Sequence, residues 1–266
     1  MSDSFSHFTS SMHCYFGQTH QVFQGGKGPI VILLHEMPNP YPENFDFGYR
    51  LIQAGYQVFM PVLFGIPNQA FSNRNAIKNI AKACIQKEFA VFSKGQSSPI
   101  TDWLRAFCQQ LLKEQQQSQL GMIGMCFTGN FALAFLAEPW MVAPVLSQPS
   151  LPYGISHSHQ KGLHVSDAVL QQAKQRPDLE VLGFRFTEDW MCPKRRFDAL
   201  KKALPNHFTG IEIDNSKGNP HGIQRMAHSV FTKDFVDQEG HPTHQAWLTL
   251  LAFLEMHLPS TLPNDP

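Results

Sequence analysis

The sequence predicts an α/β fold with a mainly parallel central sheet covered by helices on both faces. Short apolar runs alternate with longer segments of helical periodicity, which is typical of parallel strands joined by helical crossovers. The run at residues 30–34 is entirely β-branched or aliphatic, as expected of a strand buried on both faces. With 266 residues, the chain has room for one large domain of this class. We expect a flexible tail at 1–12 and a single domain at 13–266.

The elements before residue 120 follow from local signals. A short strand at 21–24 ends at the turn 25–29, which is rich in glycine. After the strand at 30–34, three prolines between Pro38 and Pro42 exclude a helix. They predict a rigid loop at the carboxyl end of a central strand, where open α/β sheets bind ligands. The following elements are predicted as a helix at 43–54, a strand at 56–61, an apolar loop at 62–67 and helices at 75–90 and 100–116.

The alternation continues to the end of the chain. Within 120–135, a short apolar run meets closely spaced glycines, and small and apolar residues then resume at helical spacing. This pattern predicts a sharp strand-to-helix turn. The later elements are predicted as a strand at 141–146, loops at 147–154 and 154–166, a helix at 167–175, a strand at 179–186, a helix ending near 204, a strand at 210–214, a long loop from 215 to about 229 and an amphipathic helix at 243–257.

Charge and composition favour a small-molecule partner. The 21 basic and 21 acidic side chains cancel, and no basic cluster is longer than residues 194–196, so nothing favours a nucleic-acid or anionic-membrane partner. No apolar run approaches the roughly 18 residues of a membrane span. The polar first residues lack the features of a signal peptide, and we therefore expect a cytoplasmic protein.

The cysteines and histidines do not predict a metal or a disulfide framework. The five cysteines are odd in number and include no CxxC pair, so we interpret them as free thiols. His157 and His159 form the tightest histidine pair but have no nearby third ligand. We expect no metal and no cofactor.

Cys126 occupies the tip of the predicted strand-to-helix turn. Gly124, Cys126 and Gly129 form the pattern Gly-x-Cys-x-x-Gly, which is close to the nucleophile elbow of α/β-hydrolases. Small residues surround such a nucleophile because the strained turn has no room for larger ones. Here cysteine replaces the usual serine, and Thr128 stands where the second glycine is expected. The pattern therefore predicts a cysteine nucleophile on an α/β-hydrolase fold.

An acid and a histidine follow the cysteine on loops at the same edge of the predicted sheet. Cys126, Asp189 and His228 occur in the α/β-hydrolase order of nucleophile, acid and histidine. A thiol is only slightly ionised at neutral pH, so a catalytic cysteine needs a base or a helix N-terminus. The turn supplies the helix and His228 the base, while Asp189 would orient the imidazole and stabilise its charged form.

The sequence resembles the dienelactone hydrolase family. The resemblance spans most of the chain from about residue 30 and rests on five motifs, at residues 30–36, 60–65, 124–129, 186–193 and 228–229. It implies a carboxylic ester or lactone hydrolase of the carboxymethylenebutenolidase class, acting on a small molecule. The pairing of the cysteine elbow with His35-Glu36 after the first core strand is the most specific part.

The resemblance also implies individual roles. Cys126 matches the nucleophile that attacks the carbonyl carbon, and Asp189 and His228 match the acid and the base. Glu36 matches a glutamate that contacts the resting thiol and helps to deprotonate it. The backbone N–H groups of Met37 and Phe127 match the oxyanion hole.

Several alternatives remain open at this stage. His221 lies on the same loop as His228 and could be the base instead, although the spacing to the last helix favours His228. Glu188 could replace Asp189. The family binds its substrate carboxylate with arginines, one of them four residues after the catalytic histidine, where this chain has Thr232. A second hypothesis is therefore a catalytically silent binding or thiol-sensing module. The sequence does not predict an oligomeric state.

Overall fold

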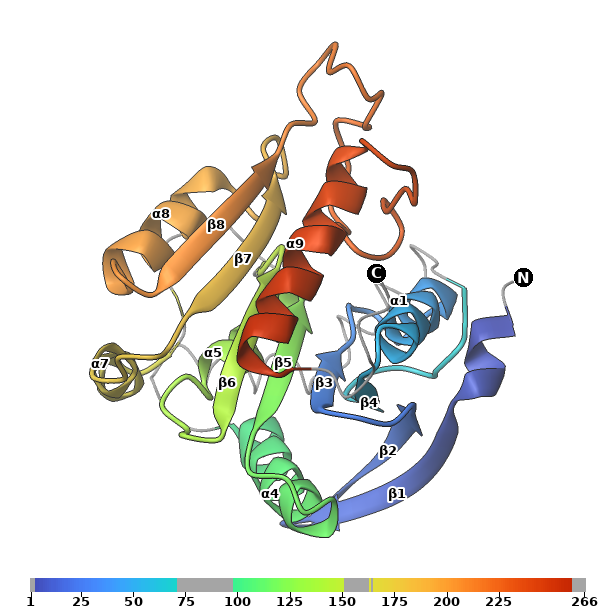
Figure 1. Ribbon diagram of the computed structural model, residues 1–266, viewed down its shortest axis with the longest axis vertical. Coiled ribbons are helices and arrows are strands. Elements are labelled where there is room, and N and C mark those ends of the chain that lie inside the picture. Colours follow the sequence, from blue (N-terminus) through green and yellow to red (C-terminus); the bar gives the residue numbers. More distant parts are fainter. Residues whose placement is uncertain (1–2, 71–97, 151–162, 164, 260–266) are drawn as a thin grey trace.

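Eight strands form one sheet in the computed structural model, which describes residues 3–70, 98–150, 163 and 165–259 (Figure 1). The strands are β1 (Thr9–Tyr15), β2 (Gln18–Gly25), β3 (Ile30–Leu34), β4 (Gln57–Pro61), β5 (Leu120–Met125), β6 (Met141–Ser147), β7 (Val181–Phe186) and β8 (Phe208–Ile213). Their order is β1-β2-β4-β3-β5-β6-β7-β8. All neighbours from β4 to β8 are parallel, and β2 pairs antiparallel with β1 and β4. The predicted mainly parallel α/β sheet is confirmed.

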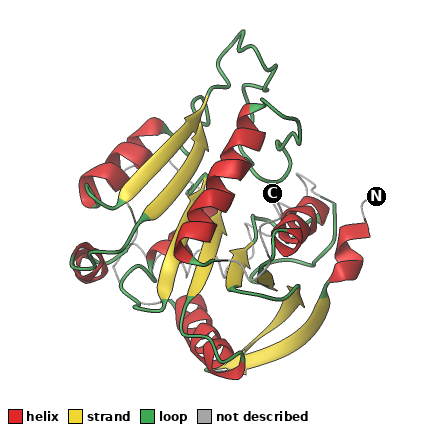
Figure 2. Cartoon of the chain, viewed as in Figure 1, coloured by secondary structure: helices red, strands yellow, loops and turns green. Residues whose placement is uncertain are grey.

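Helices cover the sheet on both faces (Figure 2). They are α1 (Pro42–Gln53), α4 (Pro99–Glu114), α5 (Gly129–Leu133), α7 (Asp167–Lys174), α8 (Lys194–Ala203) and α9 (Pro242–His257). On one face, α1 and α9 contribute Phe47 and Trp247 to a core shared with the sheet. On the other, α4, α5 and α8 contribute Trp103, Phe131 and Phe197. Among the helices described, none has the length and apolar character needed to cross a membrane.

The central strands are buried along their whole length. Every residue of β3 and β5 is buried, because these strands have neighbours on both sides and helices on both faces. Leu34 pairs with Gly124, so β3 and β5 end side by side. The loops that follow them therefore meet at the carboxyl edge of the sheet, where the sequence analysis placed the site.

The N-terminal segment differs from the flexible tail expected at residues 1–12. Asp3–His7 form a 3-10 helix, η1, and Thr9–Tyr15 form β1, which pairs with β2 over its whole length. Phe8 is buried, with its ring 5.5 Å from that of Phe45 in α1. The residues of β1 are mostly exposed, so the strand has little apolar periodicity to reveal it. Its order comes from backbone pairing with β2.

Some predicted features lie outside the described residues. They are the helix at 75–90, most of the loop at 154–166, Cys84, His157 and His159. The helix expected immediately after Cys126 begins instead with a 3-10 turn, η2 (Cys126–Thr128), and continues as the short α5.

Candidate active site

Cys126 is the first residue of η2 and lies in a strained turn directly after β5. Its φ of 53° is in the left-handed region, which a residue with a side chain enters at a cost of about 1–3 kcal/mol. Thr128 helps to hold this geometry: its hydroxyl accepts a hydrogen bond from the Met125 amide at 3.1 Å and lies 2.9 Å from the carbonyl oxygen of Leu34. Threonine therefore replaces the expected glycine while its hydroxyl ties the turn to the end of β3.

Gly124 is required by close packing at the same turn. A β-carbon on Gly124 would lie 2.7 Å from the α-carbon of Gly129 and 2.9 Å from the carbonyl oxygen of Thr128. Both obstacles are backbone atoms, which cannot move aside as a flexible side chain can. The glycines of the motif thus allow α5 to start directly against β5, as the elbow pattern predicted.

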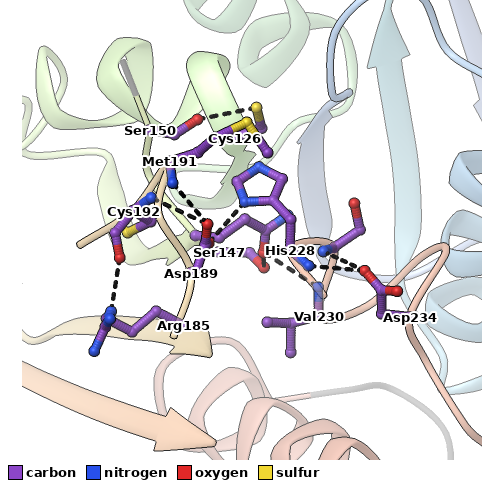
Figure 3. A network of polar contacts seen from close by, with 12 residues as sticks. Cys126, Ser147, Ser150, Arg185, Asp189, Met191, Cys192, His228, Val230 and Asp234 are labelled. Atoms are coloured by element: carbon purple, nitrogen blue, oxygen red, sulfur yellow. Dashed lines mark hydrogen bonds and ion pairs between the residues drawn. The ribbon is translucent and has the colours of Figure 1, made fainter. Parts of the chain in front are cut away.

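Asp189 and His228 form a buried pair. The Nδ1 of His228 lies 2.7 Å from Oδ2 of Asp189, and both residues are buried. The other carboxylate oxygen of Asp189 accepts hydrogen bonds from the amides of Met191 at 2.9 Å and Cys192 at 3.2 Å. Because Nδ1–H donates to Asp189, Nε2 is left for other partners. Figure 3 shows the imidazole between the Asp189 carboxylate and Cys126.

The long loop after β8 is held in place by Asp234 and Asn215. One carboxylate oxygen of Asp234 accepts hydrogen bonds from the amides of His228 and Ser229, each at 2.9 Å. The buried Asn215 accepts from the Glu188 amide at 2.7 Å and donates to two carbonyl groups of the loop. These contacts fix the imidazole relative to the acid loop. No sequence motif pointed to Asp234 or Asn215.

The alternative acid and base lie elsewhere. His221 is exposed, and its ring is 5.5 Å from that of His241. Glu188 is also exposed, with a carboxylate oxygen 3.4 Å from the Arg225 guanidinium. The geometry therefore brings together Asp189 and His228 rather than Glu188 or His221.

The sulfur of Cys126 contacts Ser150. Its Sγ lies 3.0 Å from Oγ of Ser150, in the loop that follows β6. The buried Nε2 of His228 makes no close hydrogen bond with a described residue, although the Cys126 sulfur is near enough to act on the imidazole. The thiol is thus directed towards Ser150 while the imidazole nitrogen beside it is open to a reacting group. Sequence reasoning placed the 147–154 loop at this edge but gave no reason to select Ser150.

The surroundings of His228 favour its charged form. Burial alone would lower the pKa of the imidazole, but the Cys126 sulfur and the Asp189 carboxylate outweigh it and raise that pKa well above its usual value. A histidine in this position can hold the proton of the thiol and return it to a leaving group.

Glu36 lies beside this pair but has other partners. One carboxylate oxygen accepts hydrogen bonds from the hydroxyls of Ser229 and Thr232, each at 3.1 Å, and the other accepts from the Gln148 side-chain amide. None of its contacts among the described residues is with the Cys126 sulfur, which Ser150 contacts instead. The resting contact with the thiol that the resemblance implied for Glu36 is therefore absent. Its carboxylate joins the loops that carry Gln148 and His228.

Burial raises the pKa of Glu36 to about 7, although the nearby His228 charge and the Thr232 and Ser229 hydroxyls act in the opposite direction. Because the folded-state pKa is raised, the contribution of Glu36 to stability is full below the unfolded pKa of 4.5 and is lost as the pH rises towards 7. Between pH 5 and pH 8, the parent should lose about 2 to 3 kcal/mol of unfolding free energy through the ionisation of Glu36. Glu36→Gln should lack this part of the loss. Urea unfolding of both proteins at the two pH values measures this difference. The titration of His228, common to both proteins, largely cancels; equal pH dependence would contradict the assignment.

Met37 and Phe127 lie on the loops that follow β3 and β5. Phe127 is buried in η2, directly after the nucleophile position. The loop of Met37 is shaped by His35, whose Nε2 accepts a hydrogen bond from the Leu63 amide at 3.1 Å while Nδ1–H donates to the Glu36 carbonyl at 2.6 Å. Burial lowers the pKa of His35 to about 4, so it stays neutral in this role. The two amides thus come from adjacent strand ends.

The remaining thiols do not form a site. Among the described residues, Cys14, Cys108, Cys126 and Cys192 are free, and no group of three metal-ligating side chains occurs. Cys192 is fully buried, and burial together with the neighbouring Asp189 raises the pKa of its thiol far above the usual range. It packs in the hydrophobic core as an uncharged side chain of the loop that carries Asp189.

Comparisons with known proteins show the family and the fold of the chain. The model of the dienelactone hydrolase family matches residues 12–258. A solved structure from Klebsiella pneumoniae, described as a candidate dienelactone hydrolase, shares 17% identity over 92% of this chain and 98% of its own, with a TM-score of 0.58. A lidless serine hydrolase of the α/β class from Xanthomonas campestris shares 11% identity over 97% and 98% of the two chains, with a TM-score of 0.58. At these identities the structures show a shared fold. A comparison with curated proteins finds no match.

Proposed function

The chain belongs to the dienelactone hydrolase family and is a hydrolase, and on that basis we propose that it cleaves carboxylic esters or lactones with Cys126 as the nucleophile. The observation that carries this proposal is the position of Cys126 at the strained turn, beside a buried Asp189–His228 pair whose Nε2 is open. A cysteine, a histidine and an orienting carboxylate in this arrangement can perform acyl transfer without a cofactor.

The reaction proceeds through a thioester. The Cys126 sulfur attacks the carbonyl carbon, and the thiol proton resides on His228. When the tetrahedral intermediate collapses, the C–O bond breaks and His228 gives its proton to the leaving alkoxide. A water molecule then attacks the thioester as His228 accepts its proton. Collapse of the second intermediate breaks the C–S bond and releases the carboxylic acid, and the proton held by His228 can return to the sulfur.

The oxyanion of each tetrahedral intermediate lies, in this proposal, at the amides of Met37 and Phe127. Two such donors are typically worth about 3 kcal/mol each in transition-state stabilisation. Phe64 borders this region, with its ring 5.9 Å from that of Phe127 and 6.4 Å from that of Phe131.

Glu36 has a positioning role in this proposal. Its carboxylate accepts hydrogen bonds from Ser229 and Thr232, which follow His228 in the chain. It also accepts one from Gln148, directly after β6. Thr232 stands where the family resemblance places a carboxylate-binding arginine, and its hydroxyl is engaged with Glu36. The proposal therefore covers small esters and lactones in general, without a requirement for an acidic substituent.

The proposal is tested by measuring the hydrolysis of p-nitrophenyl acetate and of a simple uncharged lactone. Hydrolysis of either substrate, lost on replacement of Cys126, supports the proposal. Labelling of Cys126 by iodoacetamide in a protein that hydrolyses neither substrate would favour the silent thiol-sensing alternative instead.

A further inference from the structure

Ser150 is held against the nucleophile by its own backbone. Its amide donates a hydrogen bond to the Cys126 carbonyl at 3.0 Å, and its carbonyl accepts one from the Asn130 side-chain amide at 2.9 Å. Asn130 also donates to the Phe127 carbonyl at 2.8 Å, and its own oxygen accepts from the buried Arg196. The segment that carries Ser150 is thus tied by hydrogen bonds to the turn that carries Cys126.

The hydroxyl of Ser150 is buried and fixed on the sulfur. Ser150 is 2% exposed, and its Oγ lies 3.0 Å from Sγ of Cys126 (Figure 3). A hydroxyl carries one proton and can donate it to an acceptor. Because His228 favours its charged form, the proton of the thiol has a place on the imidazole, and the sulfur beside Ser150 can act as the acceptor. Hydrogen bonds to a charged atom are roughly twice as strong as those between neutral groups.

The other polar groups of the site do not occupy this position. The Glu36 carboxylate is bound by Gln148, Ser229 and Thr232, and Asp189 is bound by His228 and two amides. The sulfur contacts the Ser150 hydroxyl at 3.0 Å, and it also interacts with the His228 imidazole. The Ser150 hydroxyl, and not the Glu36 carboxylate, is therefore the group that contacts the resting sulfur.

We propose that Ser150 is a further catalytic residue, whose hydroxyl donates a hydrogen bond to the Cys126 sulfur and stabilises its negative charge. That charge develops when the thiol proton moves to His228 before attack on the carbonyl carbon, and again when the C–S bond of the thioester breaks. Ser150 keeps its own proton throughout, and the proton of the thiol is carried by His228. The catalytic part of this inference rests on the proposed function; the contact with the sulfur does not.

The test measures the reactivity of Cys126 directly. Iodoacetamide is reacted with the intact protein from pH 5 to pH 9, and the modified Cys126 peptide is quantified by mass spectrometry, so no ester turnover is needed. Loss of a hydrogen bond to a charged group predicts that Ser150→Ala alkylates about 10- to 100-fold more slowly at pH 7 and that its pH profile moves to higher pH. Ser150→Thr, which keeps the hydroxyl, should stay close to the parent.

Matched variants keep this test falsifiable. Ser11→Ala removes an exposed hydroxyl on β1 and should react as the parent does. Ser150→Gly repeats the measurement if Ser150→Ala fails to give the parental circular dichroism spectrum. A folded Ser150 variant without the hydroxyl that alkylates at the parental rate and with the parental pH profile would overturn the proposal. Failure of the parent to hydrolyse esters, with the Ser150 effect intact, would reject the proposed function alone.

Discussion

Replacing Cys126 with alanine is expected to lower kcat for p-nitrophenyl acetate by at least about 10⁴-fold, because removal of a nucleophile eliminates the acyl-enzyme route. The turn should survive this change. Alanine at Cys126 still has to adopt the φ of 53°, but the contacts made by Thr128 and the packing of Gly124 do not involve the sulfur. Steady-state hydrolysis, with circular dichroism to verify folding, measures the effect.

The control for this replacement is another thiol in the same chain. Cys14 is exposed on β1, at the far edge of the sheet order from the site, and Cys14→Ala should keep the parental rate. Retention of full activity by a folded Cys126→Ala protein would show that a different group attacks the substrate. Ser150 would then be the first residue to examine, because its hydroxyl lies beside the vacated position.

The second large effect is expected from Asp189→Asn, which should reduce kcat by about 10³- to 10⁴-fold. The carboxylate of Asp189 accepts from Nδ1 of His228, so it selects the orientation and protonation of the imidazole. An amide can present its NH₂ group to Nδ1 and thereby favour the opposite tautomer. It would also remove the charge that helps to raise the pKa of His228. Measurement of kcat and KM separately should show that the loss falls mainly on kcat.

Neighbouring residues of the same type provide controls for the acid and the base. Glu188→Gln alters an exposed carboxylate paired with Arg225 and should leave turnover unchanged. His221→Ala removes an exposed imidazole and should do the same, whereas His228→Ala should match the loss in Asp189→Asn to within an order of magnitude. Greater sensitivity at Glu188 and His221 than at Asp189 and His228 would reject the assignment.

Most of the sheet could be predicted because its central strands are buried on both faces. The strands at 30–34 and 120–125 carry continuous runs of apolar residues and glycine, which local sequence reveals without knowledge of their partners. The nucleophile turn could be predicted for a related reason: Gly124 and Gly129 are required where two backbones approach within van der Waals distance. Both features depend on residues that are close together in the sequence, so local patterns are enough to predict them.

The remaining features depend on contacts between distant segments. β1 is ordered by pairing with β2, although most of its side chains are exposed. The partners of Glu36 come from residues 112 to 196 positions away, and Ser150 reaches Cys126 only because β5 and β6 end side by side. Sequence separation of this size leaves no periodic signal, so the contact of the sulfur with Ser150 rather than Glu36 required the folded structure.

The central claim is that Cys126 forms a covalent thioester during ester hydrolysis. The most direct measurement is mass spectrometry of the protein quenched in acid during turnover of p-nitrophenyl acetate, followed by peptide mapping. The account predicts an acetyl adduct on the peptide that contains Cys126, removable by hydroxylamine and absent from Cys126→Ala. Turnover by the parent protein accompanied by an adduct on Ser150, or by no adduct on Cys126 when the reaction is quenched within the first turnover, would contradict it.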